Sequence, residues 1–312
     1  MSSEVQSGAE LAVPVAPKQR SPMWFAWRRF IANKAAVVSG AILVVLILAA
    51  ILAPLFTKTA PDQQAFLQQA LAMPSAEFWF GVDDLGRDFF TRIVYGARVS
   101  LTIGFAAAAF SVLIGIPLGA LAGYFGGRTD WVIMRIIELF SVVPSLLAAL
   151  LLGAITGGGF LTIIVISALF GWVNVCLLVR AQVKALREKE FIRASQALGA
   201  SPWYIIRRHL IPNAISPIIV GFVLAIPLAM MLEASLSFLG IGVPPPTPSW
   251  GQMINVGMNF MFFYWHMAVF PTAALAITVL ATTLFGDGLR DALDPPLMGR
   301  CLVLPPRPTL PA

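Results

Sequence analysis

Charged residues are scarce in this chain. Only 12% of its 312 residues are Asp, Glu, Lys or Arg, whereas 58% are hydrophobic and the mean hydropathy is +0.84. An average soluble domain carries about 25% charged residues, and it needs them to cover its surface. The composition therefore excludes an ordinary water-soluble protein and predicts a membrane protein.

Cysteine and histidine are also scarce. The two cysteines, Cys176 and Cys301, exclude a disulfide scaffold and a four-cysteine metal site, and His209 and His266 leave little material for a histidine-based metal centre. The G-x-x-x-x-G-K-[ST] pattern of P-loop nucleotidases is absent, and the dipeptide Gly-Lys occurs nowhere in the chain. We therefore expect no metal site, no cofactor and no ATP bound through a P-loop in this chain.

Six apolar runs without an ionisable side chain are long enough, or nearly long enough, to cross a membrane. A helix needs about 20 mostly apolar residues to span a hydrocarbon core of about 30 Å. Lipid offers no partner to an unpaired backbone group, so each span must be helical. The runs cover residues 35–56, 101–125, 139–156, 161–179, 214–232 and 267–286. We predict an all-α polytopic membrane protein with six transmembrane helices.

The positive charges predict the orientation of these spans. The net charge is +6, but in a membrane chain the location of Lys and Arg matters more than their sum. All but four of the 21 Lys and Arg residues lie in the N-terminal tail, in the loops after the second and fourth spans, or in the C-terminal tail. Because positive residues favour the cytoplasmic side, we expect both termini in the cytoplasm, and a lipid bilayer rather than nucleic acid as partner.

The spans also predict how the chain is organised. The first run is too long for a typical signal-peptide core, so we interpret it as a retained anchor. The predicted segments are a cytoplasmic tail at 1–34 (disordered over 1–22), the first helix at 35–56, an external segment at 57–100, a core domain of five spans at 101–286 with a cytoplasmic loop at 180–213 and an outer loop at 235–265, and a cytoplasmic tail at 287–312.

The cytoplasmic loop predicts two short helices joined by a corner. Phe191, Ile192, Ser195 and Leu198 recur at helical spacing and indicate a first helix with an apolar stripe. Gly199 then suits a helix C-terminus, where a positive φ is needed.

The second half of the loop begins as a helix and ends at a proline. Ser201 is a good N-cap and Pro202 a good first-turn residue, while Pro212 closes the segment before the next span. A basic amphipathic elbow of this kind fits a groove on another protein. An interfacial helix lying against lipid headgroups is the alternative, and the interruption at Gly199 and Ser201 favours docking.

At these residues the loop resembles the cytoplasmic loop of ABC-importer permeases, whose pattern is E-A-A, three residues, G, nine residues, I-x-L-P. Arg193-Ala194-Ser195 stands at E-A-A, Gly199 at the glycine and His209-Leu210-Ile211-Pro212 at I-x-L-P. The spacing is kept, but Arg193, Ser195, His209 and Ile211 depart from the pattern. In that family the loop docks on the ATP-binding subunit. The coupling residues implied by the resemblance are Phe191, Arg193, Ala194, Ser195, Leu198, Gly199, Ala200, Ser201, Pro202, Trp203 and Pro212.

Further segments are similar to the C-type permease subunits of dipeptide and oligopeptide importers. They are residues 80–88 with 95–98, residues 233–240 with 244–251, and residues 286–295. The resemblance implies a type I ABC importer permease fold in a bacterial inner membrane, and a transport subunit rather than an enzyme. It also implies a homologous second permease, two P-loop ATPases that bind ATP and Mg, and an external substrate-binding protein. Dipeptides, longer peptides, glutathione and nickel complexes are the cargoes of that group.

The external segment contains a group of charged residues, Asp83, Asp84, Arg87 and Asp88. A catalytic or metal-binding cluster of acids is one interpretation. A helix start is favoured, because acids are stabilising near a helix N-terminus and Arg87 can pair locally. Contact with the external binding protein is the functional alternative.

Two features lie within or beside the spans. Glu233 lies at the outer end of the fifth span, near Ser235 and Ser237, and an ionisable group at membrane depth is a candidate for function. These three residues are candidates for the translocation pathway or an outer gate, with a structural role equally open. Pro144 interrupts the third span, where proline bends a helix or frees carbonyl groups toward a cavity.

Three other classes of protein fit this sequence less well. An ion- or proton-coupled secondary transporter usually places ionisable residues at mid-membrane, and the six runs contain none. An intramembrane Ser–His enzyme would need a histidine within a span, and neither His209 nor His266 lies there. A purely structural anchor would not need the elbow. The importer interpretation is therefore favoured, with the secondary transporter as its alternative.

Overall fold

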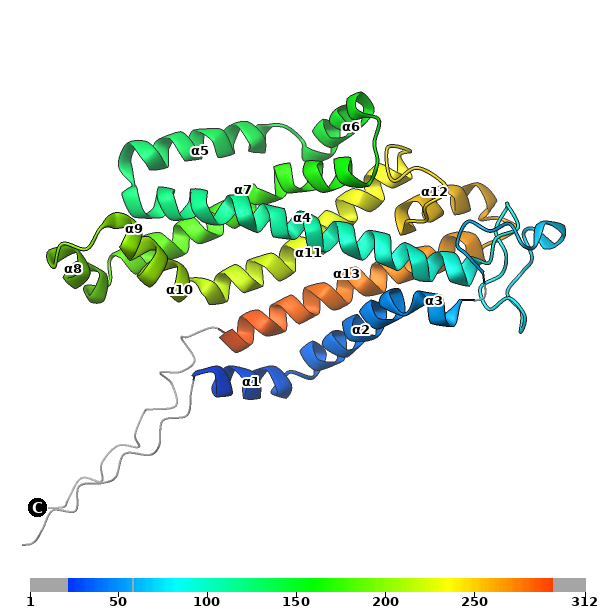
Figure 1. The fold of residues 1–312 in the computed structure, drawn as a ribbon, viewed down its shortest axis with the longest axis horizontal. Coiled ribbons are helices and arrows are strands. Elements are labelled where there is room, and N and C mark those ends of the chain that lie inside the picture. The colour runs from blue at the N-terminus through cyan, green and yellow to red at the C-terminus, as the bar shows by residue number, and fades with distance from the viewer. Residues whose placement is uncertain (1–21, 58, 294–312) are drawn as a thin grey trace, which may run out of the picture.

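The computed structural model describes residues 22–57 and 59–293, which form an elongated bundle of helices (Figure 1). Within these ranges the structure has no strand, and one isolated antiparallel bridge joins Val82 and Asp88. The all-α prediction is confirmed for this part of the chain. Residues 1–21, where disorder was predicted, and residues 294–312 of the C-terminal tail lie outside the described residues.

Five helices are long and apolar enough to cross a membrane, and a sixth span is broken. The broken span consists of α5 (Gly127–Val142) and α6 (Ser145–Thr156), which meet at 81° on either side of Pro144. The predicted six spans thus correspond to five continuous helices and one bent pair. The five are α2 (Lys34–Ile51), α4 (Phe89–Phe125), α7 (Phe160–Arg187), α11 (Ile215–Phe238) and α13 (His266–Leu293).

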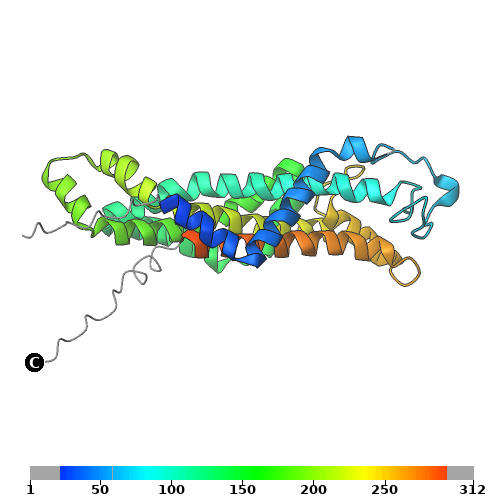
Figure 2. The ribbon, with the colours of Figure 1, turned by 90° about the horizontal axis from the view of Figure 1, so that it is seen from below.

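Shorter helices lie at the ends of these spans. α1 (Pro22–Ala32) precedes α2, α3 (Ala53–Phe56) follows it, and α12 (Trp250–Phe260) lies between α11 and α13. A single 3₁₀ turn spans Leu67–Gln69. Figure 2 shows α2 crossing obliquely over the other helices of the bundle.

The second span begins earlier than its apolar run. α4 starts at Phe89 rather than near residue 101, because the Asp88 carboxylate accepts a hydrogen bond from the Thr91 N–H at 2.8 Å and caps the helix. The last part of the predicted external segment at 57–100 is therefore the first part of α4.

Three glycines let α4 and α7 pack closely. Gly115, Gly119 and Gly123 recur every four residues on one face of α4. A Cβ atom added at Gly119 would lie 2.6 Å from the Cys176 carbonyl oxygen, and one at Gly123 would lie 2.8 Å from the Arg180 carbonyl oxygen. Small residues at this spacing allow two helix backbones to approach, which is how membrane helices associate without a hydrophobic driving force.

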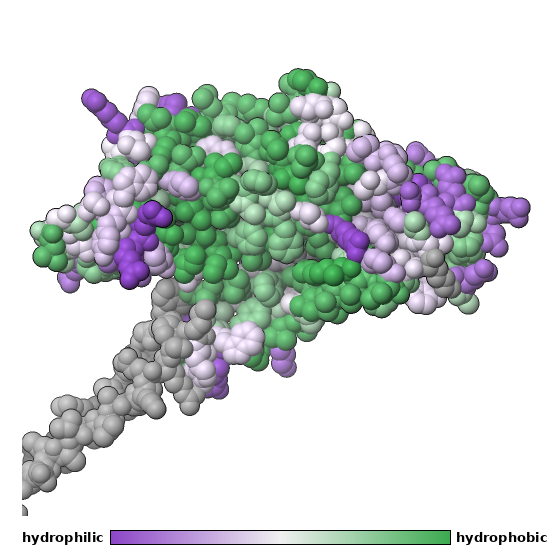
Figure 3. All heavy atoms as spheres, viewed as in Figure 1, coloured by the Kyte–Doolittle hydropathy of each residue, from purple (hydrophilic) through white to green (hydrophobic). Residues whose placement is uncertain are grey.

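The bundle has two polar ends and an apolar middle. α8–α10, α1 and the C-terminal end of α13 lie toward one end, while residues 59–88 and α12 lie toward the other (Figure 1). Figure 3 shows hydrophobic side chains covering the middle of this face and hydrophilic ones gathered at its two ends. The helix axes therefore run from one aqueous side to the other.

Gly119→Leu is expected to destabilise the protein by at least about 1–3 kcal/mol, because the added side chain collides with α7 backbone that cannot move aside. Thermal unfolding in detergent measures the effect. Ala109→Leu, on an exposed position of the same helix, is the matched control and should leave the transition unchanged. Equal effects from both variants would contradict the close α4–α7 packing.

Candidate functional site

The loop at residues 180–213, predicted to be cytoplasmic, forms the predicted elbow. α8 (Glu190–Ala197) ends before Gly199, whose φ is +79°, and α9 (Pro202–Ile205) starts at Ser201, whose hydroxyl accepts a hydrogen bond from the Tyr204 N–H at 3.3 Å. Both local predictions are confirmed. A single π-helical turn (Ile206–Leu210) and α10 (Ile211–Asn213), which contains Pro212, lead into α11.

One face of the elbow is packed into the membrane helices. Ile192, Ile205 and Leu210 are completely buried and belong to one core cluster with Val183 of α7 and Ile218 of α11. Each fully buried aliphatic side chain contributes about 1.5–3 kcal/mol. The elbow is therefore held firmly to α7 and α11, and a displacement of one is transmitted to the others.

The opposite face of the elbow carries exposed apolar side chains. Leu198 is 89% exposed and Trp203 61% exposed, and Phe191 and Tyr204 are also exposed. We call these four residues the apolar tip. Of the predicted apolar stripe, Ile192 faces the core, whereas Phe191 and Leu198 face outward. Clustered exposed apolar side chains of this size mark an interaction surface.

The remaining predicted elbow residues shape its backbone or its charge. The Ser195 hydroxyl donates to the Phe191 carbonyl oxygen at 2.9 Å. Arg193 donates to the Glu188 carboxylate at 2.9 Å, and this hydrogen bond, together with Arg187, holds the pKa of Glu188 below its usual value. Arg193 therefore pairs within the loop. Ala194 and Ala200 complete the first helix and the corner.

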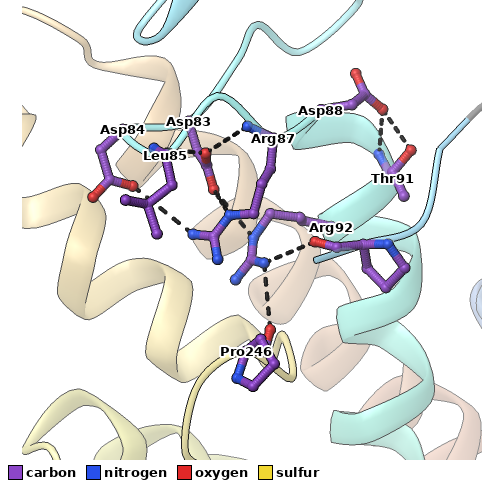
Figure 4. Close-up of polar contacts among 9 residues, drawn as sticks. Asp83, Asp84, Leu85, Arg87, Asp88, Thr91, Arg92 and Pro246 are labelled. Carbon is purple, nitrogen blue, oxygen red and sulfur yellow. Dashed lines mark hydrogen bonds and ion pairs between the residues drawn. The ribbon is translucent and has the colours of Figure 1, made fainter. Parts of the chain in front are cut away.

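At the other end of the bundle, Asp83, Arg87 and Arg92 form a cluster that we call the external latch. The Asp83 carboxylate accepts hydrogen bonds from the Arg87 N–H at 2.8 Å and from Arg87 Nε at 2.6 Å, and Arg92 Nε lies 3.4 Å away. Figure 4 shows both guanidinium groups converging on this carboxylate. All three side chains are buried, so none of them presents its charge to a partner.

Arg92 extends the external latch to distant segments. Its Nη1 donates to the carbonyl oxygens of Pro61 at 2.9 Å and Pro246 at 3.4 Å. It thereby ties the start of α4 to the segment that precedes this helix and to the loop before α12. Arg92 was not predicted from the sequence, although its position four residues after Asp88, on the apolar side of a helix start, was an available signal.

The other two acids of this group differ from Asp83. Asp88 caps α4, and Arg87 pairs locally, so the predicted helix start is confirmed. Asp84 is only partly buried and lies 3.9 Å from Arg87 Nη2. Burial raises the pKa of Asp84, and the neighbouring Asp83 charge raises it further.

Glu233 lies in the packed interior rather than at a surface. Its carboxylate accepts hydrogen bonds from the Ser237 hydroxyl at 2.8 Å and from the Ser100 hydroxyl of α4 at 3.1 Å. Ser100 also accepts from the Trp250 N–H at 3.4 Å. Ser235 donates to its own helix, at the Met231 carbonyl oxygen. Glu233 thus joins α4, α11 and α12, a placement that favours a structural role.

Comparison with known proteins identifies the family of this chain. The model of the family "binding-protein-dependent transport system inner membrane component" matches residues 115–298, more than half of the chain. The chain belongs to this family. The model of the N-terminal transmembrane domain of oligopeptide transport permease C matches residues 21–74.

Curated relatives cover nearly the whole permease. The oligopeptide transport system permease protein OppC of Bacillus subtilis is 44% identical over 86% of this chain and 88% of its own length. The dipeptide transport system permease protein DppC of Bacillus subtilis is 43% identical over 87% and 85%. The glutathione transport system permease protein GsiD of Pectobacterium atrosepticum is 39% identical over 89% and 92%.

A solved structure supports the fold. A chain of the inward-facing MetNI methionine ABC transporter aligns with a TM-score of 0.51 and 20% identity, covering 66% of this chain and 98% of its own. The protein is thus a multi-pass inner-membrane permease subunit of an ATP-binding cassette importer. Importers of this family work with ATPase and substrate-binding partners, and their permeases are transport components rather than enzymes.

The external latch predicts opposite effects for two adjacent acids. Asp83→Asn is expected to destabilise the permease by about 3–5 kcal/mol, because Arg87 and Arg92 stay buried without their counter-charge. Asp84→Asn is expected to stabilise it at neutral pH, because burial and Asp83 disfavour the charged form of Asp84.

The pH dependence follows from the direction of the Asp84 shift. Its pKa is higher in the folded protein than the ordinary 3.8, so the penalty on folding is present at neutral pH and absent below 3.8. The advantage of Asp84→Asn over the unchanged permease should therefore shrink as the pH falls toward that value. Thermal unfolding in detergent between neutral pH and pH 3.8 is the measurement. A loss of stability in Asp84→Asn as well as in Asp83→Asn would contradict the opposite effects assigned to the two acids.

Proposed function

We propose that this permease is the C-type subunit of a short-peptide importer. It forms half of the translocation pathway with a homologous second permease. Two P-loop ATPases dock on the elbow, and an external binding protein delivers the cargo. The observation that carries the proposal is the two-faced elbow, whose apolar tip is exposed while its other face is packed into α7 and α11. The cargoes named for the relatives, oligopeptides, dipeptides and glutathione, share a short peptide-like chain.

The elbow supports a mechanism of alternating access. ATP and Mg, held by the partner ATPases, close the ATPase pair and move the docked elbow. Because Ile192, Ile205 and Leu210 hold the elbow to α7 and α11, these helices move with it and the pathway opens outward. The binding protein then releases its peptide into the permease, and hydrolysis returns the inward-open state. The helices thus alternate between an inward-open and an outward-open state, and the ATPases at one end and the binding protein at the other shift the equilibrium between them.

We place both termini and the elbow in the cytoplasm. Most Lys and Arg residues lie in the segments at that end of the bundle, as the positive-inside rule requires. The residues at the opposite end, including Asp84 and Asp88, then face the external binding protein. Asp83 and Arg87 support that face from within, because both are buried.

Reconstitution tests the transport proposal. The full assembly, with partner permease, ATPases and binding protein in proteoliposomes, should accumulate tri-alanine only when hydrolysable ATP is supplied. The carrier alternative predicts uptake driven by an ion or proton gradient without ATP. Uptake of this kind, or no uptake of peptide by an assembly whose ATPase is active, would overturn the proposal.

Trp203→Ala is expected to lose most of the co-purified ATPase, because truncating a buried interface tryptophan costs about 2 kcal/mol or more, a loss of roughly thirtyfold in affinity. Since Trp203 is 61% exposed in the free permease, the fold should be unaffected. Trp79→Ala is the matched control, as Trp79 is 66% exposed at the opposite end. Quantified ATPase in the purified complex is the measurement, and unchanged binding by Trp203→Ala would contradict docking at the apolar tip.

The same two positions test the orientation. In a Cys301→Ser background, Trp79→Cys should react with a membrane-impermeant maleimide in intact spheroplasts, and Trp203→Cys only after the membrane is permeabilised. The remaining Cys176 is completely buried and should stay unlabelled. The reverse pattern of labelling would place the termini outside.

A further inference from the structure

A cavity of about 660 Å³ lies at the break in the third span. This volume falls within the range of about 300–1,000 Å³ that holds small ligands. Its walls come from α4, α5, α6, α7 and α11 and carry no charged side chain. The polar groups among the lining residues are hydroxyls and one amide, those of Ser111, Ser141, Ser145, Ser167 and Asn174.

The N-terminus of α6 opens onto this cavity without a cap. Pro144 and Ser145 line the cavity, and no side chain caps the helix. Along α6, Ala148 is the first residue whose backbone N–H has an acceptor, and it donates to the Pro144 carbonyl oxygen at 3.1 Å. In the part of the chain that the structure describes, the N–H groups of Ser145, Leu146 and Leu147 have no acceptor.

The bend explains why these three N–H groups are free. In a continuous helix they would donate to carbonyl oxygens at the end of α5, but the 81° angle at Pro144 turns α6 away from them. Unpaired backbone groups are unfavourable within a membrane span unless they line a cavity. A free helix N-terminus also carries partial positive charge and binds anions.

Ser167 of α7 provides an independent observation. This residue is only 4% exposed and lines the cavity. Its Oγ nevertheless has no hydrogen-bond partner among the described residues. The neighbouring hydroxyls differ, because Ser111 donates to the Ala107 carbonyl oxygen and Ser141 to that of Ile137, both at 2.8 Å. A buried hydroxyl without a partner is unfavourable and indicates a missing hydrogen-bonding partner, to which it can donate.

We propose that the free N-terminus of α6 and the Ser167 hydroxyl bind the C-terminal carboxylate of the cargo peptide as it passes through the permease. This inference rests on the proposed function as a peptide importer. The three backbone N–H groups are donors and the Ser167 hydroxyl can also donate, which matches an anion with several acceptor positions. The binding needs no Lys or Arg, in keeping with a lining that carries none.

The rest of the cavity suits side chains of varied sequence. Phe140, Phe170, Leu228 and Leu232 supply apolar walls without a hydrogen-bonding pattern that would select one side chain. The site thus recognises a group that all free peptides carry, the C-terminal carboxylate, and selects little among the side chains of the other residues.

Two variants test the site without threatening the fold. Ser145→Asp places a carboxylate at the first turn of α6, where a negative charge stabilises the helix. The same carboxylate occupies the anion site and repels the carboxylate of the cargo. Ser167→Ala removes the unpartnered hydroxyl, a change that a purely structural role would leave neutral or stabilising. Ser39→Ala is its control, because the Ser39 hydroxyl is buried but satisfied by the Ala36 carbonyl oxygen.

The measurement is uptake of tri-alanine and of tri-alanine amide by the reconstituted assembly, with the same binding protein throughout. Uptake of the free acid should fall by about tenfold or more in both variants. In Ser167→Ala the cargo carboxylate loses a hydrogen bond, and in Ser145→Asp it is repelled by the new carboxylate. Uptake by Ser39→Ala should stay within about twofold of the unchanged protein, and any uptake of the amide should change little in all variants.

The outcomes separate the inference from the proposed function. Unchanged uptake of the free acid in Ser145→Asp and Ser167→Ala overturns the carboxylate site while peptide transport stands. An equal fall for acid and amide, or loss of the partner permease from the complex, also overturns it, since either indicates a structural role. Failure of the unchanged assembly to carry tri-alanine overturns the peptide-transport proposal itself.

Discussion

Inside a membrane each backbone N–H and C=O group must be satisfied by the chain itself, and the rest of this structure depends on that constraint. Five spans meet it as continuous helices, and glycines at Gly115, Gly119 and Gly123 let two of them approach backbone to backbone. The break at Pro144 is the departure from this rule. It leaves the N–H groups of Ser145, Leu146 and Leu147 without an acceptor among the described residues, and Ser145 lines the cavity. The departure therefore marks where a ligand, rather than the protein, supplies the acceptor.

The elbow and the cavity are connected by the same two helices. α7 carries Ser167 at the cavity and Val183 in the core of the elbow, and α11 carries Leu228 at the cavity and Ile218 in that core. A force applied at the apolar tip thus reaches the cavity through continuous helical backbone without crossing a loop. Close packing makes such a connection stiff, because side chains in a full core cannot absorb a displacement.

Charge is used differently at the two ends of the bundle. On the elbow the charged side chains are exposed, so the Arg193–Glu188 pair shapes the surface and contributes little to stability. At the other end, Asp83 is buried between Arg87 and Arg92, and Arg92 reaches Pro61 and Pro246. A buried carboxylate that neutralises two guanidinium groups holds three segments of chain in one arrangement. That end of the bundle is thereby held together from within, whereas the elbow at the opposite end exposes its apolar tip.

Features that depend on near neighbours were predictable from the sequence. The spans follow from apolar length, the corner at Gly199 and Ser201 from helix capping, and the start of the second helix at Asp88 from the same chemistry. Each of these rests on residues within a few positions of one another. Local pattern was sufficient there because one hydrogen bond or one φ value decides the outcome.

Other features depended on which residues the fold brings together. Arg92 meets Pro246, and Glu233 meets Ser100, across more than a hundred positions of sequence. Helical spacing grouped Ile192 with Leu198, but only packing against α7 and α11 decided that the first is buried and the second exposed. The proline at position 144 indicated a bend, whereas its angle and the cavity beside it came from the tertiary structure. Burial and cavities are properties of several helices at once, and no single segment of sequence contains them.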